Sequence, residues 1–358
     1  MQEIRHSAIL AAAGSGKTTE LVKRALLVPP EETVLLTTYT RTGEEEIRRA
    51  IRYQCDVTPA NITVMSWFTF LYRHGLLPYQ NPTFGVNWFR GIHFEHPGQR
   101  WIKKTDTVRF FADQSRLAYK DFLAELVVLI DEVNDGGVFS RISSLFHHVM
   151  VDELQDLSAG DFDVLKRLCD VCNSVVVVGD PRQGTFSTSQ DRKNRQYVRS
   201  NVSRWLNELN DKQVFLLENR NFSYRCRKEI CRFADSLFPE FPATVSMNQR
   251  VTGHDGLFAI TSEDVDHYAG LFKPQVLVWE NASRHEDRAR NFGDVKGLTF
   301  ERVLIYPTKT IEEYLSGGKL LKEVTRAKFY VAITRASQSV AIVLNGAEPN
   351  GLNRWERK

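Results

Sequence analysis

Few cysteines and no long apolar run set the first limits on this chain. Its 358 residues include five cysteines, at Cys55, Cys169, Cys172, Cys226 and Cys231. This small, odd number argues against a disulfide-stabilised secreted protein, and half-buried helix thiols are favoured over a metal site. Stretches such as 123–130 fall far short of the ~20 apolar residues of a membrane span. No charged and then apolar leader precedes residue 11, so we expect a soluble, cytoplasmic protein with no membrane partner.

Neither sign of charge dominates the composition. The chain has 47 Lys and Arg against 44 Asp and Glu, for a formal net charge of +3. These totals do not indicate a strongly basic nucleic-acid-binding protein, so local clusters must carry that argument. A chain that is 42% hydrophobic and 25% charged is ordinary for a globular protein. Its length indicates about two or three domains, with a core that needs no metal or disulfide.

Glycine is placed where a phosphate-binding loop needs it. The stretch Ala11-Ala12-Ala13-Gly14-Ser15-Gly16-Lys17-Thr18-Thr19 follows a short apolar run and opens a helical pattern that reaches residue 27. Backbone N–H groups and the helix dipole at such a position favour an anion. Lys17 would reach the β- and γ-phosphates, and Thr18 would hold Mg²⁺. Ala11 replaces the first glycine of the strict pattern, but the context still predicts ATP and Mg²⁺ as cofactors bound by residues 12–19.

Short apolar runs alternate with helical patterns along the whole chain. We expect strands at 33–38, 62–65, 146–151, 174–178, 214–217, 275–279, 303–306 and 339–343. This alternation predicts an α/β fold with parallel sheets and right-handed crossovers. The expected division is a first domain at 1–76 and 143–210, a small, mostly helical inserted subdomain at 77–142, a second domain at 211–350, and a mobile polar tail at 351–358.

Acidic residues and arginines stand at or just after the ends of several expected strands. Asp152 and Glu153 end an apolar strand, where Asp152 can accept from water on Mg²⁺ and Glu153 can deprotonate the attacking water. Gln183, after another strand, could sense the γ-phosphate. Arg225 and Arg335 are candidate guanidinium groups for phosphoryl transfer, with Arg335 at the end of a strand expected over 331–336. The alternative interpretation is that the acid pair caps a helix and that the segment with Gln183 is a solvated turn.

The order of these motifs resembles the superfamily 1 DNA helicases of the UvrD/Rep/PcrA type. The motifs extend over nearly the whole chain. They are Ala11–Thr18, Thr37–Ile47, Val151-Asp152-Glu153-Leu154-Gln155-Asp156, Val178-Gly179-Asp180-Pro181-Arg182-Gln183, Tyr224-Arg225, Lys296-Gly297-Leu298-Thr299-Phe300 and Val331–Ala336.

The resemblance implies two RecA-like P-loop NTPase domains that bind ATP between them and move 3′-to-5′ along single-stranded DNA. It implies that Glu153 is the catalytic base, that Gln183 couples hydrolysis to motion, and that Arg225 and Arg335 contact the γ-phosphate. Tyr224 would stack on adenine, and Gly297 would lie at the nucleotide. The nucleic-acid candidates are Tyr39, Thr40, Arg41, Trp67, Phe186 and Lys296, since aromatic faces stack on bases.

Departures from the family pattern leave other functions open. Only ten residues precede Ala11, so the glutamine motif that reads adenine is missing or replaced, and the region between Arg225 and Lys296 is too short for the usual accessory domain. A nucleotide-gated subunit of a DNA-repair or anti-phage assembly, for example with a nuclease, is therefore an alternative, as monomer or hetero-complex. A P-loop kinase for a small molecule is a third interpretation, disfavoured by the two arginine motifs.

Overall fold

The computed structural model describes residues 6–95, 98, 101–157, 159–185, 194–284, 289–346 and 351–357. Their contacts divide the chain into two compact units, which we describe separately. The first unit takes its described residues from 1–10, 17–181 and 186–219, and the second from 11–16, 182–185 and 220–358. Loop residues 11–16 thus group with the second unit, although the strand before them and the helix after them belong to the first.

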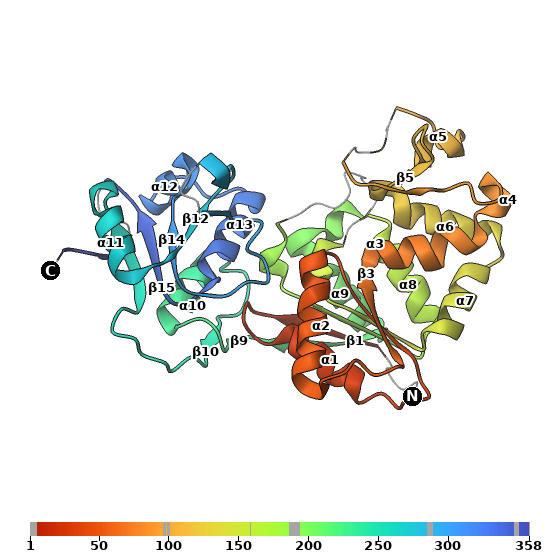
Figure 1. Ribbon diagram of the computed structural model, residues 1–358, viewed down its shortest axis with the longest axis horizontal. Helices are drawn as coiled ribbons and strands as arrows, with labels where there is room; N and C mark the ends of the chain where they lie inside the picture. Colours follow the sequence, from red (N-terminus) through yellow and green to blue (C-terminus); the bar gives the residue numbers. More distant parts are fainter. Residues whose placement is uncertain are drawn as a thin grey trace. The chain divides into compact units, whose positions relative to one another are not determined.

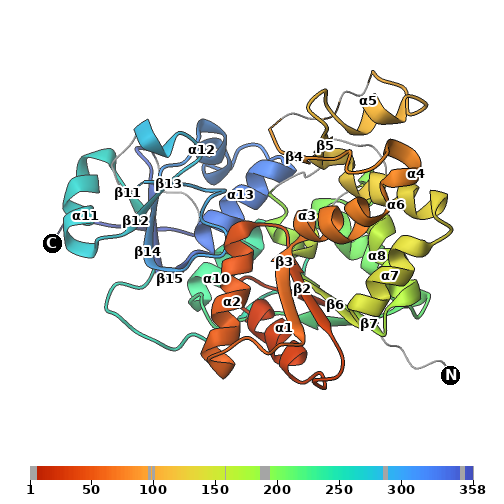
Figure 2. The same cartoon turned by 45° about the vertical axis from the view of Figure 1, so that its right-hand side comes forward.

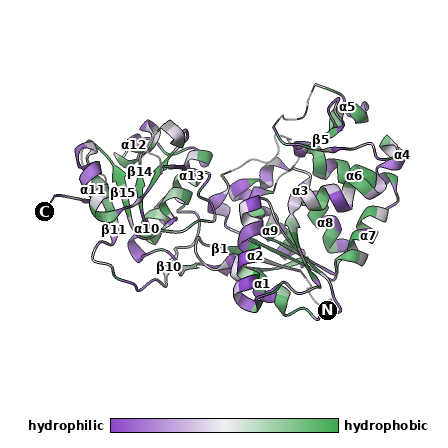
Figure 3. Ribbon diagram, in the orientation of Figure 1, coloured by the Kyte–Doolittle hydropathy of each residue, from purple (hydrophilic) through white to green (hydrophobic). Residues whose placement is uncertain are grey.

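The first unit is built on a six-stranded sheet whose strands with described register pair in parallel. In spatial order, its strands are β3 (Ile62–Ser66), β2 (Val34–Thr38), β6 (His148–Val151), β7 (Ser174–Gly179), β1 (His6–Ala11) and β8 (Phe215–Arg220). The central strands are runs of Val, Ile and Leu, as expected for a sheet covered on both faces. They appear as the hydrophobic interior of the unit in Figure 3.

Alternate side chains of these strands pack on opposite faces of the sheet. Ala8, Leu35 and Val149 join a core cluster with residues of the insertion and of the helices that follow it. On the other face lie α1 (Lys17–Leu26) and α2 (Arg41–Cys55), which bury Leu21, Ile47 and their apolar neighbours and stand in front of the strands in Figures 1 and 2. The face that carries Ala8, Leu35 and Val149 packs against α6 (Leu123–Val133), α7 (Gly137–Leu145), α8 (Asp161–Val171) and α9 (Val202–Asp211).

The insertion between β3 and β6 contains helices and one small sheet. It opens with α3 (Trp67–Phe70), which continues as a π-helical turn over Leu71–Leu76, and includes α4 (Asn81–Phe84) and α5 (Thr107–Phe111). Strands β4 (Gly91–His93) and β5 (Leu117–Tyr119) pair with each other. Residues 103–130 of this mostly helical region do not form one continuous helix, because Asp113 accepts from the Leu117 backbone N–H at 2.8 Å and closes a turn into β5.

The second unit has its own six-stranded sheet, in which every neighbouring pair is parallel. Its order is β13 (Arg290–Asn291), β12 (Gln275–Val278), β14 (Phe300–Ile305), β15 (Ala336–Val343), β11 (Gly256–Ile260) and β16 (Asn353–Arg354). A short ribbon pairs β9 (Phe222–Ser223) with β10 (Val245–Ser246). The helices are α10 (Lys228–Ser236), α11 (Val265–Phe272), α12 (Lys309–Leu315) and α13 (Glu323–Ile333).

Three expectations about this half of the chain are wrong. The run at 214–217 becomes β8, which pairs beside β1, so residues 211–219 belong to the first unit. The strand expected over 331–336 is the end of α13, followed at Ala336 by β15. Residues 351–357 of the tail pack against the second unit, because β16 pairs with β11 at the sheet edge, Leu352 is buried, and Arg357 forms an ion pair with Asp264 at 2.6 Å.

Within the described ranges, no helix combines the length and the apolar composition that crossing a bilayer would require.

Candidate active site

Three strands of the first sheet deliver polar residues to one edge. Lys17 begins α1 just after β1 and the loop, Asp152 follows β6, and Asp180 follows β7. The strands β6, β7 and β1 are neighbours and their described pairs are parallel, so their carboxyl ends meet. Ligand sites in such sheets form at this edge. The edge therefore gathers a cation and two carboxylates from distant parts of the sequence.

Thr18 and Asp152 are in direct contact at this edge. The Thr18 hydroxyl donates to Asp152 Oδ2 over 2.6 Å. Burial, followed by the nearby charge of Glu153, raises the pKa of Asp152 to about 6, while the Thr18 hydrogen bond and the Lys17 charge act in the opposite direction. A carboxylate that is costly to keep charged when buried gains most from a bound cation.

Glu153 is held in an unusual backbone conformation. Its φ of 59° lies in the left-handed region, which non-glycine residues adopt rarely and mostly where the surrounding structure enforces it. Its backbone N–H donates to Asp152 Oδ1 at 2.8 Å. Gln155 donates its side-chain amide to the Glu153 carboxylate and accepts from the Asp180 backbone N–H at 3.0 Å. Sequence reasoning gave Gln155 no role, although its place beside the two acids in the motif was the available signal.

The loop 11–16 makes its contacts within the second unit. Ala12 donates its backbone N–H to the Arg220 carbonyl at 3.0 Å, and the Gly14 carbonyl accepts from the Tyr224 N–H at 2.9 Å. Gly14 has a φ of +75°, and a Cβ there would lie 2.5 Å from Arg225 Cβ, so only glycine fits. The Ser15 hydroxyl is buried and has no hydrogen-bond partner among the described residues, as expected of a group that binds phosphate.

The second unit also joins Gln183 to Arg335. Arg335 is only 2% exposed, and its guanidinium donates to Gln183 Oε1 at 3.2 Å, to the Val331 carbonyl at 3.2 Å and to the Leu298 carbonyl at 3.4 Å. Arg225 donates to the Thr334 carbonyl at 3.2 Å. The two arginines expected from the motifs therefore lie against the same turn after α13. Tyr224, the residue before Arg225, is 62% exposed.

The donor set at the carboxylate edge fits Mg²⁺. This ion prefers hard oxygen ligands and keeps several waters, so one hydroxyl and one carboxylate beside a phosphate are sufficient. Thr18 and Asp152 supply that pair, and Lys17 is adjacent to carry phosphate charge. The described part of the chain holds no group of three or more His, Cys, Asp and Glu residues that could bind a metal without such a co-ligand.

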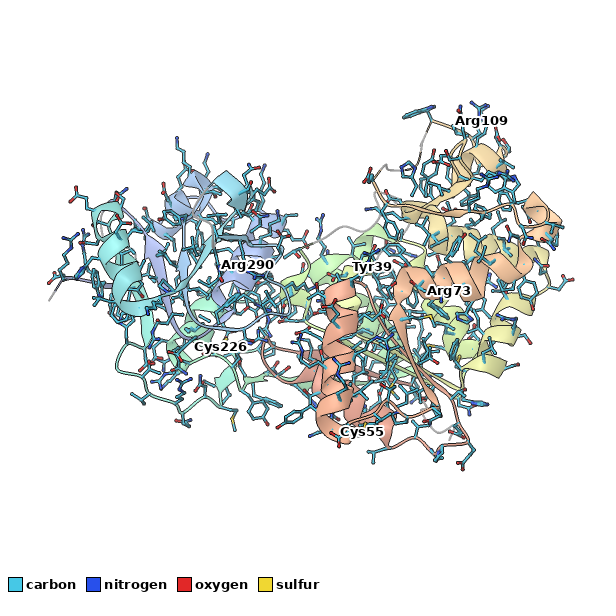
Figure 4. The ribbon with its side chains drawn as sticks, in the orientation of Figure 1. Tyr39, Cys55, Arg73, Arg109, Cys226 and Arg290 are labelled. Atoms are coloured by element: carbon cyan, nitrogen blue, oxygen red, sulfur yellow. The ribbon has the colours of Figure 1, made fainter. Side chains whose placement is uncertain are left out.

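The residues predicted to bind nucleic acid lie in different environments. Thr40 caps α2 by accepting from the Gly43 N–H at 3.0 Å, and Arg41 is exposed at the first position of that helix. Tyr39, labelled in Figure 4, is half-buried and packs edge-on against Phe68. Lys296 is half-buried beside Gly297, whose φ is +85°. These four residues remain candidates.

Trp67 is a correction, because it belongs to the core. Its side chain is 0% exposed, and the indole N–H donates to Asp161 Oδ1 at 2.7 Å, so neither face of the ring can stack on a base. Phe186 lies outside the described residues. The sequence pattern could not separate Trp67 from a stacking residue, because an aromatic at a strand end serves either purpose.

Family comparisons agree with this geometry. A family described as the viral superfamily 1 RNA helicase core domain matches residues 135–344, and a family described as an AAA domain matches residues 2–188. The chain belongs to the superfamily 1 helicases. The first match covers the acids, Gln183 and both arginines, while the second covers the phosphate loop and the acids. Neither match assigns the chain to the UvrD/Rep/PcrA type.

The solved structures to which this chain is similar include viral helicases. The arterivirus nonstructural protein 10 helicase is 17% identical with a TM-score of 0.48, and the match covers 94% of this chain and 59% of that chain. The same viral protein in complex with DNA is 17% identical with a TM-score of 0.47, and the match covers 95% of this chain and 61% of that chain. The PRRSV helicase is 16% identical with a TM-score of 0.45, and the match covers 95% of this chain and 52% of that chain. This chain thus spans little more than half of those proteins. No curated protein matches it by sequence.

Proposed function

We propose that this protein hydrolyses ATP and uses the energy to move along single-stranded nucleic acid, with duplex unwinding as the result. The observation that carries the proposal is the 2.6 Å contact between Thr18 and Asp152 beside Lys17 and Glu153. Family membership then selects a helicase from the many P-loop enzymes that share such an edge.

Each residue has a stated part in hydrolysis. Lys17 and the loop N–H groups neutralise the phosphates, and Thr18 and Asp152 would hold Mg²⁺, which supplies charge stabilisation of the transferring phosphoryl group. Glu153 takes the proton from the attacking water, and Gln155 orients that carboxylate. Gln183 relays the state of the γ-phosphate through its hydrogen bond to Arg335, and Arg335 and Arg225 stabilise the charge that develops during transfer.

The strand on which the protein moves is proposed as DNA, with 3′-to-5′ direction, from the motif pattern in the sequence. The description of the matching family instead names RNA helicases, which makes RNA the second candidate. Tyr39, Thr40, Arg41 and Lys296 are proposed to contact the strand. A nuclease or other protein partner stays a prediction of the sequence alone.

ATPase assays with oligo-dT, oligo-U and no oligonucleotide test the proposal. We expect a single-stranded oligonucleotide to raise the wild-type ATPase rate severalfold. The oligonucleotide that gives the higher rate identifies whether DNA or RNA is preferred. Glu153→Gln should bind ATP but lower hydrolysis by roughly 10²–10⁴-fold, the usual contribution of a positioned base. Glu313→Gln, an exposed acid on α12, is the matched control and should retain the wild-type rate.

An ATPase rate that no nucleic acid changes would contradict the motor function, whereas normal turnover by Glu153→Gln would contradict only the assignment of the base. Direction is read from strand displacement on duplexes with a 3′ or a 5′ single-stranded tail, where the sequence predicts unwinding of the 3′-tailed substrate.

A further inference from the structure

A cavity of about 390 Å³ opens beside the first turn of α1, in the first unit. It is lined by residues of two helices only: Thr18, Thr19, Glu46, Arg49, Ala50, Tyr53 and Gln54. Its volume lies within the range of about 300–1,000 Å³ that is usual for small-molecule sites. Thr18 is also the partner of Asp152, so the cavity begins at the residue that the proposed nucleotide and metal site uses.

The lining from α2 forms one continuous helical face. Its residues are spaced by three, one, three and one along the sequence, which is the repeat of a single side of an α-helix. Figure 4 labels Tyr39 just before this helix and Cys55 at its end, and the face lies between these two positions, next to α1 with which α2 packs. Ala50 occupies the centre, where its small side chain leaves the hollow that a longer one would fill.

Two side chains of this face have unused capacity for a ligand. The Tyr53 ring is 92% exposed, which is unusual for a large aromatic residue. The Gln54 Nε2 is shielded from solvent and has no hydrogen-bond partner among the described residues, although buried amides are normally satisfied. An open aromatic face and an unpaired amide are the two groups that recognise a nucleobase, one by stacking and the other by hydrogen bonding to the base edge.

We propose that this face of α2 binds the nucleoside part of the nucleotide, with the base stacked on Tyr53 and hydrogen-bonded by Gln54. The proposal rests on the function proposed above, since it assumes that phosphates lie at Lys17 and Thr18. It places base recognition on the first unit, in addition to Tyr224, the stacking residue that the family resemblance implies, and it uses none of the residues before the phosphate loop. Arg49 and Glu46 also line this face, and the Arg49 guanidinium is the group that could contact the α-phosphate.

Binding of Mg-ADP and of Mg-pyrophosphate, measured by titration calorimetry, separates the nucleoside contacts from the phosphate contacts. Tyr53→Ala should weaken ADP about tenfold, in line with the loss of one stacked base, and leave pyrophosphate unchanged. Ala50→Leu, which fills the hollow with a good helix former, should do the same. Tyr53→Phe should retain wild-type ADP affinity, and Leu27→Ala, at an exposed position after α1, is the control that alters neither ligand.

The outcomes separate this inference from the function on which it rests. If the wild type binds both ligands and Tyr53→Ala and Ala50→Leu bind ADP as tightly as the wild type, the nucleoside site is wrong while the phosphate site stands. If the wild type binds neither ligand, the proposed function fails first. Equal losses for ADP and pyrophosphate would also overturn the inference, because they would show damage to the phosphate site. Thermal melts of each variant show whether the fold is intact.

Discussion

Asp152 in the first unit and Arg335 in the second are both buried ionisable side chains, and they differ in how fully their surroundings hydrogen-bond the charged form. Asp152 has a hydroxyl and a backbone N–H as hydrogen-bond donors, and its pKa still rises to about 6. Arg335 is surrounded by two backbone carbonyls, an amide oxygen and a hydroxyl. A carboxyl group can take up a proton when it is buried, but a guanidinium cannot lose one at any ordinary pH, so it must be fully hydrogen-bonded.

The difference indicates what each half contributes. The buried Asp152 carboxylate would be stabilised by an additional positive charge, which suits a group that binds a cation together with its substrate. The arginine is positioned by fixed acceptors before any ligand arrives, which suits a group that must present its charge in one geometry. The following predictions test this contrast, beginning with the largest effect.

Removing the arginine should produce the greatest loss. Arg335→Ala removes the guanidinium that donates to Gln183 Oε1 and to two carbonyls, and it opens a cavity. We therefore expect hydrolysis to fall by roughly 10³-fold and the free energy of unfolding by about 3 kcal/mol. Steady-state ATPase rates and urea unfolding measure the two effects. Arg335→Lys keeps the charge without the planar fork, and it should recover little of the rate. A lysine variant with full activity would show that charge alone matters.

The acid should make stability depend on pH in a characteristic direction. Because the pKa of Asp152 is raised from 3.8 to about 6 in the folded state, its burial favours folding only while it is protonated, and stability is lost as pH rises from about 4 to 6. Without Mg²⁺, we expect a loss of at most about 3 kcal/mol over that window. Asp152→Asn, which can still accept from Thr18, should abolish this loss.

Unfolding in the presence of Mg²⁺ tests whether Asp152 binds the ion. The ion should stabilise the wild type at pH 7 more than at pH 5, because protons compete with it below pH 6, and it should stabilise the Asn variant at neither pH. Urea unfolding with and without the ion is the measurement. A pH profile shared by wild type and variant would mean that Asp152 is not the buried acid that titrates.

The smallest effect should come from one of the arginine's several acceptors. Thr334 Oγ1 accepts from Arg335 at 3.4 Å and donates to the Tyr330 carbonyl at 2.8 Å; Thr334→Val removes both, while the other three acceptors of Arg335 remain. We expect the free energy of unfolding to fall by about 1 kcal/mol, with hydrolysis lowered less than tenfold. A loss as large as that of Arg335→Ala would show that the acceptors act as one unit and cannot be removed singly.

Much of the fold could be predicted from local patterns. The strands at 33–38, 62–65 and 174–178 are runs of β-branched and aliphatic residues between turn signals, and they form at those places as β2, β3 and β7. Thr18 and Asp152 were both expected at the Mg²⁺ site, and parallel strands bring their carboxyl ends to one edge, but their direct contact is seen only in the structure. The errors arose where a pattern has two solutions: β8 is apolar enough for either sheet, and the end of α13 is apolar on all sides.

The sequence by itself determined the phosphate loop, the acid pair and the alternation of strands and helices, because each depends on residue type and spacing within a short segment. Only the tertiary structure decided that Trp67 is a core residue, that the tail forms an edge strand, and that Tyr53 and Gln54 line a cavity next to Thr18. These placements depend on what packs against each side chain from elsewhere in the chain, and burial and hydrogen-bond partners of that kind are not encoded in local periodicity.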